Sequence, residues 1–364
     1  MRRMLVVLIL LVAGVALPAS AQEAAQRIAA AERLLERLIE TYGVSGHEDA
    51  VRELIRSELP AWAKPEVDTA GNLWVRAGKG GAPVVIVAHM DEIGYEITAI
   101  LDDGTLDLAP RGGMFASLWE GRPALIHTGS GALPAIFLPR DSAAAGTHRP
   151  PKPPRVDPGA GSRAAAEAMG IAVGQTITSP KEYTRLAGTR ATGRSFDDRV
   201  GCAALLIALR RLDVARLRHE VIFVFSVREE VGLEGARAVA NTLGVTPARV
   251  HAIDTFVSSD TPLDPQQYGL APLGKGPVVR ALDNSSVASP AQVDSLVTLV
   301  RLAGYPIQAG ATSGGNDGST FLPYGVPDIA AGWPLRYAHS PAEVIDLKDV
   351  VGLSEVVRLI AERW

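Results

Sequence analysis

Histidine and carboxylate side chains follow three of the apolar runs that predict buried strands in this sequence. Ligands of open α/β sheets bind beyond the carboxyl ends of the strands, so side chains at those positions can converge on one site. The start of a predicted helix and a Tyr-Ala-His-Ser-Pro segment near the C-terminus supply further groups of the same kind. The groups in these five segments are His89 and Asp91, Asp197 and Asp198, Glu229 and Glu230, Asp254, and His339.

This set of donors suits a pair of divalent cations. Cys202 is the only cysteine of the chain, so a bound metal must be held by imidazole and carboxylate groups, which suit Zn²⁺, Co²⁺ or Mn²⁺. Two histidines and three carboxylates are enough for two ions that share one bridging carboxylate and lie about 3.5–4 Å apart around a water. A carboxylate that lies beside this water but binds no metal would act as general base. It would take a proton from the water and pass that proton to a leaving amine.

Each of these residues alone also has an ordinary structural interpretation. His89 and Asp91 are two positions apart, so on a strand they face the same side, and the carboxylate can orient the imidazole. A single histidine at a strand end is nevertheless more often an ordinary hydrogen-bonded residue. Asp197 and Asp198 could simply cap the helix that they begin. Glu229 and Glu230 point apart in extended chain, so one could bind metal while the other faces the substrate. Only the whole set favours a metal site.

The elements that must position these residues alternate between strands and helices. Continuous β-branched runs at 84–88 and 221–225 predict strands that are buried on both faces. Apolar residues at helical spacing predict one helix from about residue 200, another from Pro290 after the N-cap Ser289, and a last one over 350–360. This alternation favours an α/β fold with a mostly parallel sheet and helices on both faces.

One stretch, from residue 93 to residue 192, interrupts the alternation. It is rich in glycine, has no long helical pattern, and contains short segments that predict the strands of a small β-rich domain. We therefore expect a catalytic domain that is divided in sequence by an inserted domain. The predicted parts are a signal peptide at 1–21, the first part of the catalytic domain at 22–92, the inserted β-rich domain at 93–192, and the second part of the catalytic domain at 193–364.

The N-terminus has the three parts of a secretory signal peptide. Arg2 and Arg3 precede an apolar run at 5–17, and the small residues of 19–21 form a cleavage site. The run is too short to cross about 30 Å of hydrocarbon as a helix. We expect removal of residues 1–21 and export to the periplasm or the medium, with no membrane anchor left after cleavage. The alternative is an uncleaved anchor or a buried N-terminal helix.

The composition is typical of a folded globular protein. Of the 364 residues, 47% are hydrophobic and 21% are charged, and the formal net charge is −4. This mild acidity argues against a nucleic-acid partner, which would need a basic stripe on the surface. The single cysteine excludes an intramolecular disulfide.

Five motifs of this chain resemble those of the glutamyl and deblocking aminopeptidases. These are two-metal peptidases known for tetrahedral assemblies, and some of them are labelled as cellulases. The resemblance covers nearly all of the chain after the predicted signal peptide. The motifs are VSGHE at 44–48, AHMDEIG at 88–94, FDDRVGC at 196–202, VREEVGL at 227–233 and RYAHSP at 336–341.

The resemblance implies a role for each residue of the set. Glu229 matches the general base, and Asp91 matches the acid behind the first metal-binding histidine. The family also has a β-rich domain used in assembly, which implies a homo-oligomer between a dimer and a dodecamer. Its members are mostly cytoplasmic, unlike the location that the N-terminus of this chain predicts. The implied ligands of two divalent ions, zinc in the first instance, are His89, Asp197 as the bridge, Glu230, Asp254 and His339.

The sequence thus predicts an exported, metal-dependent aminopeptidase that hydrolyses N-terminal residues from peptides. One alternative is a metal-independent glycoside hydrolase with paired carboxylates, which needs two carboxyl groups beside a sugar cleft. Such an enzyme would also be expected to have aromatic side chains on which sugar rings stack, and only 5% of the residues are aromatic. Another alternative is a periplasmic peptide-binding protein whose catalytic site has decayed.

Overall fold

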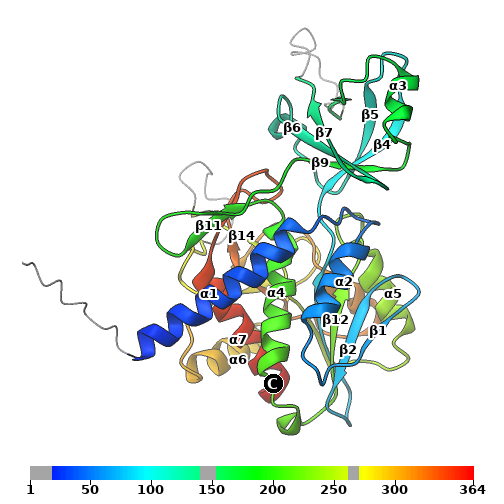
Figure 1. Ribbon diagram of the computed structural model, residues 1–364. Coiled ribbons are helices and arrows are strands. Elements are labelled where there is room, and N and C mark those ends of the chain that lie inside the picture. The colour runs from blue at the N-terminus through cyan, green and yellow to red at the C-terminus, as the bar shows by residue number, and fades with distance from the viewer. Residues whose placement is uncertain (1–18, 140–152, 261–269) are drawn as a thin grey trace, which may run out of the picture.

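The computed structural model describes residues 19–139, 153–260 and 270–364 (Figure 1). The apolar run of the predicted signal peptide lies outside these residues. The first described helix, α1 (Ala19–Glu40), begins at the predicted cleavage site and packs along the body of the molecule. Across the three described stretches, no helix combines the length and the apolarity that a bilayer-spanning segment needs.

A five-stranded mixed sheet forms the centre of the α/β body, the part of the molecule outside the barrel described below. Three neighbouring strands run parallel up to one edge of the sheet, as the β-branched runs predict, while the two strands at the other edge pair antiparallel. In spatial order the strands are β1 (Pro65–Val67), β2 (Leu73–Ala77), β12 (Val221–Ser226), β3 (Val84–His89) and β13 (Arg249–Ala252).

The α/β class is confirmed, but the expectation of a mostly parallel sheet is wrong at the β1–β2 edge. Antiparallel strands need only a tight turn between them, whereas parallel strands need a crossover. Asp68 builds that turn, because its carboxylate accepts hydrogen bonds from the backbone N–H groups of Ala70, Gly71 and Asn72. Gly71 has a φ of +100°, a conformation that suits glycine.

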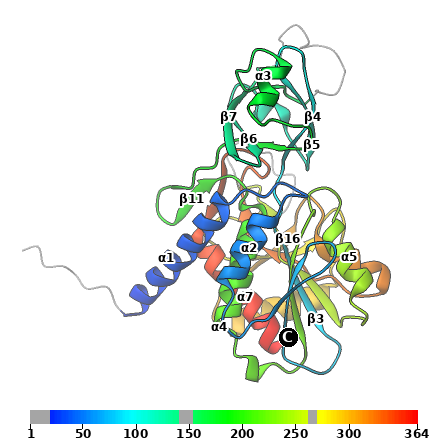
Figure 2. The same cartoon turned by 45° about the vertical axis from the view of Figure 1, so that its right-hand side comes forward.

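Helices cover both faces of the sheet, because alternate residues of each strand enter two separate cores. Val84 and Ile86 of β3 pack with α1, α2, α4, α6 and α7, whereas Val85 and Val87 pack with α5 and the 3₁₀ segment η4. The views in Figures 1 and 2 show α5 on the opposite side of the sheet from α4. The helices are α2 (Asp49–Glu58), α4 (Phe196–Arg211), α5 (Glu234–Thr242), α6 (Pro290–Leu302), η4 (Asp317–Tyr324) and α7 (Leu347–Arg363).

A closed six-stranded barrel stands at one end of the molecule, apart from the α/β body (Figure 2). It has its own core, in which Tyr95, Trp119 and Phe137 are in ring contact. The short helix α3 (Arg163–Ala168) lies on it, and η1 (Ala116–Leu118) lies between two of its strands in sequence. The barrel strands are β4 (Gly94–Ile100), β5 (Leu106–Arg111), β8 (Val156–Asp157), β7 (Gly131–Phe137), β6 (Pro123–Thr128) and β9 (Thr176–Thr178).

Three small sheets complete the α/β body and carry the loops of its C-terminal half. In one, β14 pairs parallel with β18; in another, β15 lies between β16 and β17; and in the third, β11 lies between β10 and β19. The strands are β10 (Thr184–Arg185), β11 (Arg190–Gly193), β14 (Phe256–Val257), β15 (Val278–Leu282), β16 (Gln308–Ala311), β17 (Ala331–Gly332), β18 (Pro334–Leu335) and β19 (Glu343–Asp346).

A fully buried cluster of charges lies where the chain passes from β3 into the barrel and returns from it. Glu92 follows β3, and its carboxylate is 2.8 Å from Lys181 Nζ, 2.9 Å from Arg194 and 3.6 Å from Arg199. It also accepts a hydrogen bond of 2.7 Å from the backbone N–H of Gly43. The cluster therefore ties both connections of the barrel to α4 and to the loop after α1.

Candidate metal centre

The carboxylate of Asp197 lies between two imidazoles, and each of its oxygens is nearer to a different one. His89 Nε2 is 3.1 Å from Asp197 Oδ1, and His339 Nε2 is 3.5 Å from Asp197 Oδ2. Glu230 lies on the second side, with Oε2 3.4 Å from His339 Nε2. Among the described residues, His89, Asp197 and Glu230 form a group whose possible ligand atoms all lie within 4.8 Å of one another.

Asp254, the remaining predicted ligand, follows β13 and lies at the edge of this group. It is 6% exposed and lines the same cavity as Asp197 and His339. Its Oδ2 is 3.1 Å from the guanidinium of Arg280. The next residue, Thr255, donates a hydrogen bond of 3.4 Å to Asp197 Oδ2. The structure thus brings all five predicted ligands into one neighbourhood, with the tightest contacts around Asp197.

The helix-capping and the metal-site interpretations of the Asp197-Asp198 pair apply to different residues. Asp198 is fully buried and accepts hydrogen bonds from the backbone N–H groups of Gly201 at 2.9 Å and His89 at 2.8 Å. It therefore caps α4 and ties it to the end of β3. The peptide bond between Asp197 and Asp198 is cis, and both residues have non-helical backbone angles. Asp197 faces the cavity instead.

Asp91 lies behind His89, and it also holds the two adjacent glutamates. Its Oδ1 is 3.4 Å from His89 Nδ1 and accepts a hydrogen bond of 3.0 Å from the backbone N–H of Glu229. Its Oδ2 accepts hydrogen bonds from the N–H of Glu230 at 3.2 Å and from Ser45 Oγ at 2.6 Å. One carboxylate therefore fixes the first histidine and the turn that carries the predicted general base.

Sequence reasoning missed two buried glutamates that support this site. Glu48 accepts hydrogen bonds from the N–H groups of Gly46 at 2.7 Å and Arg228 at 3.0 Å, where Arg228 has a φ of +52°. Glu343 accepts hydrogen bonds from the N–H of His339 at 2.9 Å and of Phe196 at 2.8 Å. Each glutamate thus fixes the backbone beside a site residue. Glu48 lies within a recognised motif, so the motif was the available signal, whereas Glu343 lies in none.

The glycine-rich segment 310–319 divides between the cavity and the interior. Ser313, Gly314 and Gly315 line the cavity. Asp317 is instead 3% exposed and receives a hydrogen bond from Ser226 at the end of β12. Burial raises its pKa, which the charges of His89, Asp91 and Asp254 also influence, so it is a further buried carboxylate beside the site, one to which sequence reasoning gave no role.

Buried carboxylates outnumber the cations available to them in this site. Burial raises the pKa of Glu229 well above its usual range, and the negative charges of Asp254 and Glu230 raise it further, against the effect of His89. Burial likewise raises the pKa of Asp254 to about 6, although Arg280 opposes the shift. Bound divalent cations would reverse these shifts, because they supply the missing positive charge. Two imidazoles and several carboxylates without a lysine are a donor set that fits such ions.

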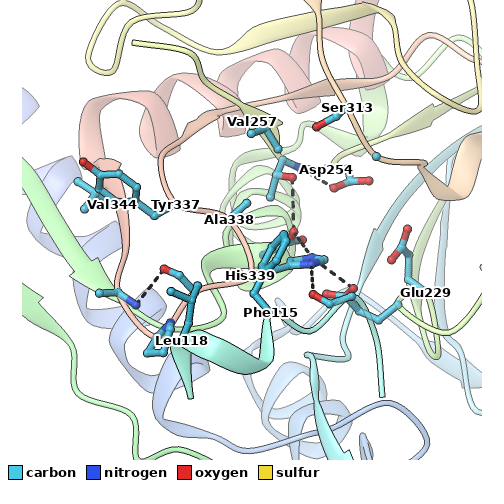
Figure 3. Close-up of a pocket in the computed structure, with 18 of the residues that line it drawn as sticks. Phe115, Leu118, Glu229, Asp254, Val257, Ser313, Tyr337, Ala338, His339 and Val344 are labelled. Carbon is cyan, nitrogen blue, oxygen red and sulfur yellow. Dashed lines mark hydrogen bonds and ion pairs between the residues drawn. The ribbon is translucent and has the colours of Figure 1, made fainter. Parts of the chain in front are cut away.

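A cavity of about 1150 Å³ opens beside these residues. Glu230 lines one part of it. Glu229 and Asp254 line the same part (Figure 3). Phe115 and Leu118, from the connection between β5 and β6 of the barrel, line another part. The backbone carbonyl of Gly113, in the same connection, is 2.9 Å from His339 Nδ1, so the barrel contributes directly to the environment of the second histidine.

The family described as M42 glutamyl aminopeptidase matches residues 71–356. This chain belongs to that family. The glutamyl aminopeptidase of Lactococcus lactis is 30% identical over 90% of this chain and 94% of its own length, and the lysyl aminopeptidase of Pyrococcus furiosus is 29% identical over 90% and 96%. The TET1 peptidase of Pyrococcus horikoshii, whose structure superimposes with a TM-score of 0.83, is 34% identical over 92% of this chain and all of its own. The recognition made from the sequence motifs is confirmed.

Membership of the M42 family establishes the general activity. The protein is a metal-dependent aminopeptidase, a hydrolase that acts on peptide bonds. The group formed by His89, Asp197 and Glu230 is where the chain offers metal ligands most compactly. The glycoside hydrolase and peptide-binding alternatives receive no support from the matched family.

Proposed function

We propose that this M42 aminopeptidase removes N-terminal residues from peptides with two divalent cations, zinc in the first instance and cobalt or manganese as alternatives. One cation would be held by His89 and Asp254 and the other by His339 and Glu230, with Asp197 shared between them. The observation that carries the proposal is the position of Asp197, whose two carboxylate oxygens lie toward different imidazoles. When bound, such cations act as Lewis acids toward the scissile carbonyl and the attacking water.

Glu229 is the general base in this proposal. Its side chain lines the cavity, and its Oε2 is 3.8 Å from His89 Nε2, so it borders the ligand group without belonging to it. The hydrogen bond from its N–H to Asp91 fixes the turn on which it lies. From this position the carboxylate takes a proton from water as the water attacks the carbonyl carbon, and then gives that proton to the leaving amine.

A panel of aminoacyl p-nitroanilides tests the function directly. The purified protein is assayed as isolated, after chelation, and after addition of Zn²⁺, Co²⁺ or Mn²⁺. We expect chelation to abolish anilide hydrolysis and metal to restore it. Hydrolysis of cellulose that resists the chelator would favour the glycoside hydrolase alternative. A metal-loaded protein that cleaves no member of the panel would favour the peptide-binding alternative.

We further propose that the protein is exported and acts as a homo-oligomer. The signal-peptide pattern at 1–21 supports export. The assembly of the related TET1 peptidase into a tetrahedron or an octahedral shell supports an oligomer. N-terminal sequencing of the protein from the periplasm or the medium tests the first proposal, and we expect the chain to begin at Gln22. Light scattering of that material tests the second, which a monomer would contradict.

A further inference from the structure

The cavity of this aminopeptidase has an apolar wall beside its metal-binding part. The residues of this wall come from four separate segments: the barrel connection, the β10–β11 turn, β14, and the chain from β18 into β19. Figure 3 shows several of them on the side of His339 away from Glu229. The apolar wall consists of Phe115, Leu118, Leu186, Val257, Tyr337 and Val344.

Several side chains of the apolar wall are unusually exposed for their type. Phe115 is 57% exposed, Leu186 39% and Leu118 38%. Apolar residues that are exposed singly are ordinary, but residues from different segments that gather in a cavity form a surface that favours an apolar ligand. A side chain of leucine, methionine or phenylalanine placed there would remove this surface and its own from water.

Charged residues that line the cavity offer little to an acidic or basic side chain. The four carboxylates that line the cavity, among them Glu229 and Asp254, belong to the metal centre. Arg280 is already occupied, because it donates to the carbonyls of Thr255 at 2.7 Å and Gly315 at 2.8 Å and pairs with Asp254 and Asp283. Within the described part of the lining, no other carboxylate could hold a lysyl side chain.

Arg122 is the one remaining cation among the described lining residues. It is exposed and lies in the turn between η1 and β6. A guanidinium in that setting keeps its hydration, so its attraction for an acidic side chain is weak. The carboxylates of the metal centre would also repel such a side chain. The chemistry of the lining therefore disfavours charged N-terminal residues of either sign.

We infer that the apolar wall receives the side chain of the substrate's N-terminal residue, so that the enzyme prefers large apolar N-terminal residues to glutamyl or lysyl ones. The inference rests on the proposed aminopeptidase function of the same cavity. It separates this chain from the relatives named for glutamyl and lysyl activity. An apolar pocket commonly discriminates by tenfold or more, and an unpaired charge inside it increases the difference.

The test compares leucyl, methionyl, phenylalanyl, glutamyl and lysyl p-nitroanilides, which share one leaving group and so report the N-terminal residue alone. With the metal-loaded protein we expect kcat/KM for the best apolar substrate to exceed that for the glutamyl and lysyl substrates by about tenfold or more. If a charged substrate is cleaved fastest, the inference is wrong while the aminopeptidase function stands. If no anilide is cleaved, the proposed function itself fails.

Three variants identify the wall. Phe115→Asp should lower kcat/KM for the leucyl substrate by about tenfold, chiefly through KM, and should improve the lysyl substrate. Leu302→Asp is the matched control, because Leu302 is 83% exposed on α6, outside the cavity lining, and should change neither value. Arg122→Ala should leave the leucyl-to-glutamyl ratio unchanged.

Two results would overturn the assignment of the wall. If Phe115→Asp changes only the dependence on the second residue of dipeptide substrates, the wall contacts the leaving part of the peptide. If Arg122→Ala removes a dominant glutamyl activity, that arginine is the specificity residue and the site selects acidic side chains.

Discussion

Adjacent acidic residues of this chain have different partners, and the difference follows from where each backbone N–H and carboxylate points. Asp198 holds backbone N–H groups in the interior, whereas Asp197 faces two imidazoles. Glu230 approaches His339, whereas Glu229 borders the cavity near His89. Two side chains of the same type, in adjacent positions, therefore have different roles: Asp197 and Asp198 in one pair, and Glu229 and Glu230 in the other.

Replacement of the general base tests the proposed role of Glu229. In Glu229→Gln we expect kcat for the best anilide to fall about 10²–10⁴-fold, because an amide cannot accept the proton from water. Metal content, measured by elemental analysis, should stay as in the parent protein, because Glu229 is outside the group of closest ligand atoms. Near-normal turnover would contradict the role, and loss of metal would make Glu229 a ligand instead.

Glu48 provides a second residue-scale prediction, as a positioning residue. The Glu48 carboxylate accepts hydrogen bonds from two backbone N–H groups. In Glu48→Gln an uncharged amide replaces it, so the turn at Arg228 is held less firmly. We expect kcat to fall about ten- to hundredfold, with little change in KM or metal content, because Glu229 is displaced.

Glu53→Gln is the matched control for that variant, since Glu53 is an exposed glutamate on the same segment and should have no effect. A purely structural role of Glu48 would instead lower thermal stability and leave kcat of the folded protein unchanged.

The strand-end residues and Asp91 were predictable from sequence, whereas the two supporting residues Glu48 and Glu343 were not. His89 ends β3 and Asp254 follows β13, so their convergence follows from the topology of the sheet. Glu48 acts on a backbone N–H that lies 180 positions away in sequence, and no local pattern encodes that contact. The role of Glu343 depends in the same way on the fold of the completed chain.

At the scale of elements, the parallel strands β3 and β12 were predictable because each contains a continuous apolar run buried on both faces. β1 has three residues with a mostly exposed pattern, so it carries no comparable signal. Strands β14, β17 and β18 have two residues each, which is too short for a hydrophobic periodicity to be recognised. These short strands nevertheless fix the segment around Asp254, because β14, which follows it, pairs with β18.

The Glu92 cluster gives the element-scale prediction. Burial alone would raise the pKa of Glu92, but Arg194, Lys181 and Arg199 hold it well below its usual range, so the carboxylate is charged in the folded protein. In Glu92→Gln three buried cations lose their counter-charge. We expect the free energy of unfolding, measured with urea, to fall by about 3–5 kcal/mol.

Glu220→Gln is the control, because its ion pair with Arg76 lies at the surface and should contribute below about 1 kcal/mol. A second variant separates charge from packing: Lys181→Met should be less harmful in the Glu92→Gln background than in the parent protein. Additive effects of the two changes would contradict the electrostatic explanation.

At the scale of the whole molecule, the metal centre draws its residues from both sides of the barrel insertion in sequence. His89 precedes the barrel, and Asp197, Glu230 and His339 follow it, spread over more than a hundred residues. The barrel connection then closes the cavity through Phe115 and the carbonyl of Gly113. The site therefore exists only when the two parts of the α/β body and the barrel are assembled.

This arrangement predicts that metal binding stabilises the entire fold and not only the site. A cation that binds the folded but not the unfolded chain adds RT ln(1 + [L]/Kd), which is about 4 kcal/mol when the free ion is a thousandfold above Kd. Chelation also leaves the buried carboxylates without that positive charge. We expect chelation to lower Tm by roughly 5–10 °C and metal to restore it.

Asp197→Asn distinguishes this effect from a general action of the chelator. The amide keeps the size of the shared side chain but removes the charge that lies between both imidazoles. The variant should therefore melt at a temperature that depends little on chelator or added metal, measured by differential scanning calorimetry. A chelator shift as large in Asp197→Asn as in the parent protein would mean that the stabilising ion binds elsewhere. An unchanged Tm in the parent protein would mean that the metal contributes to chemistry alone.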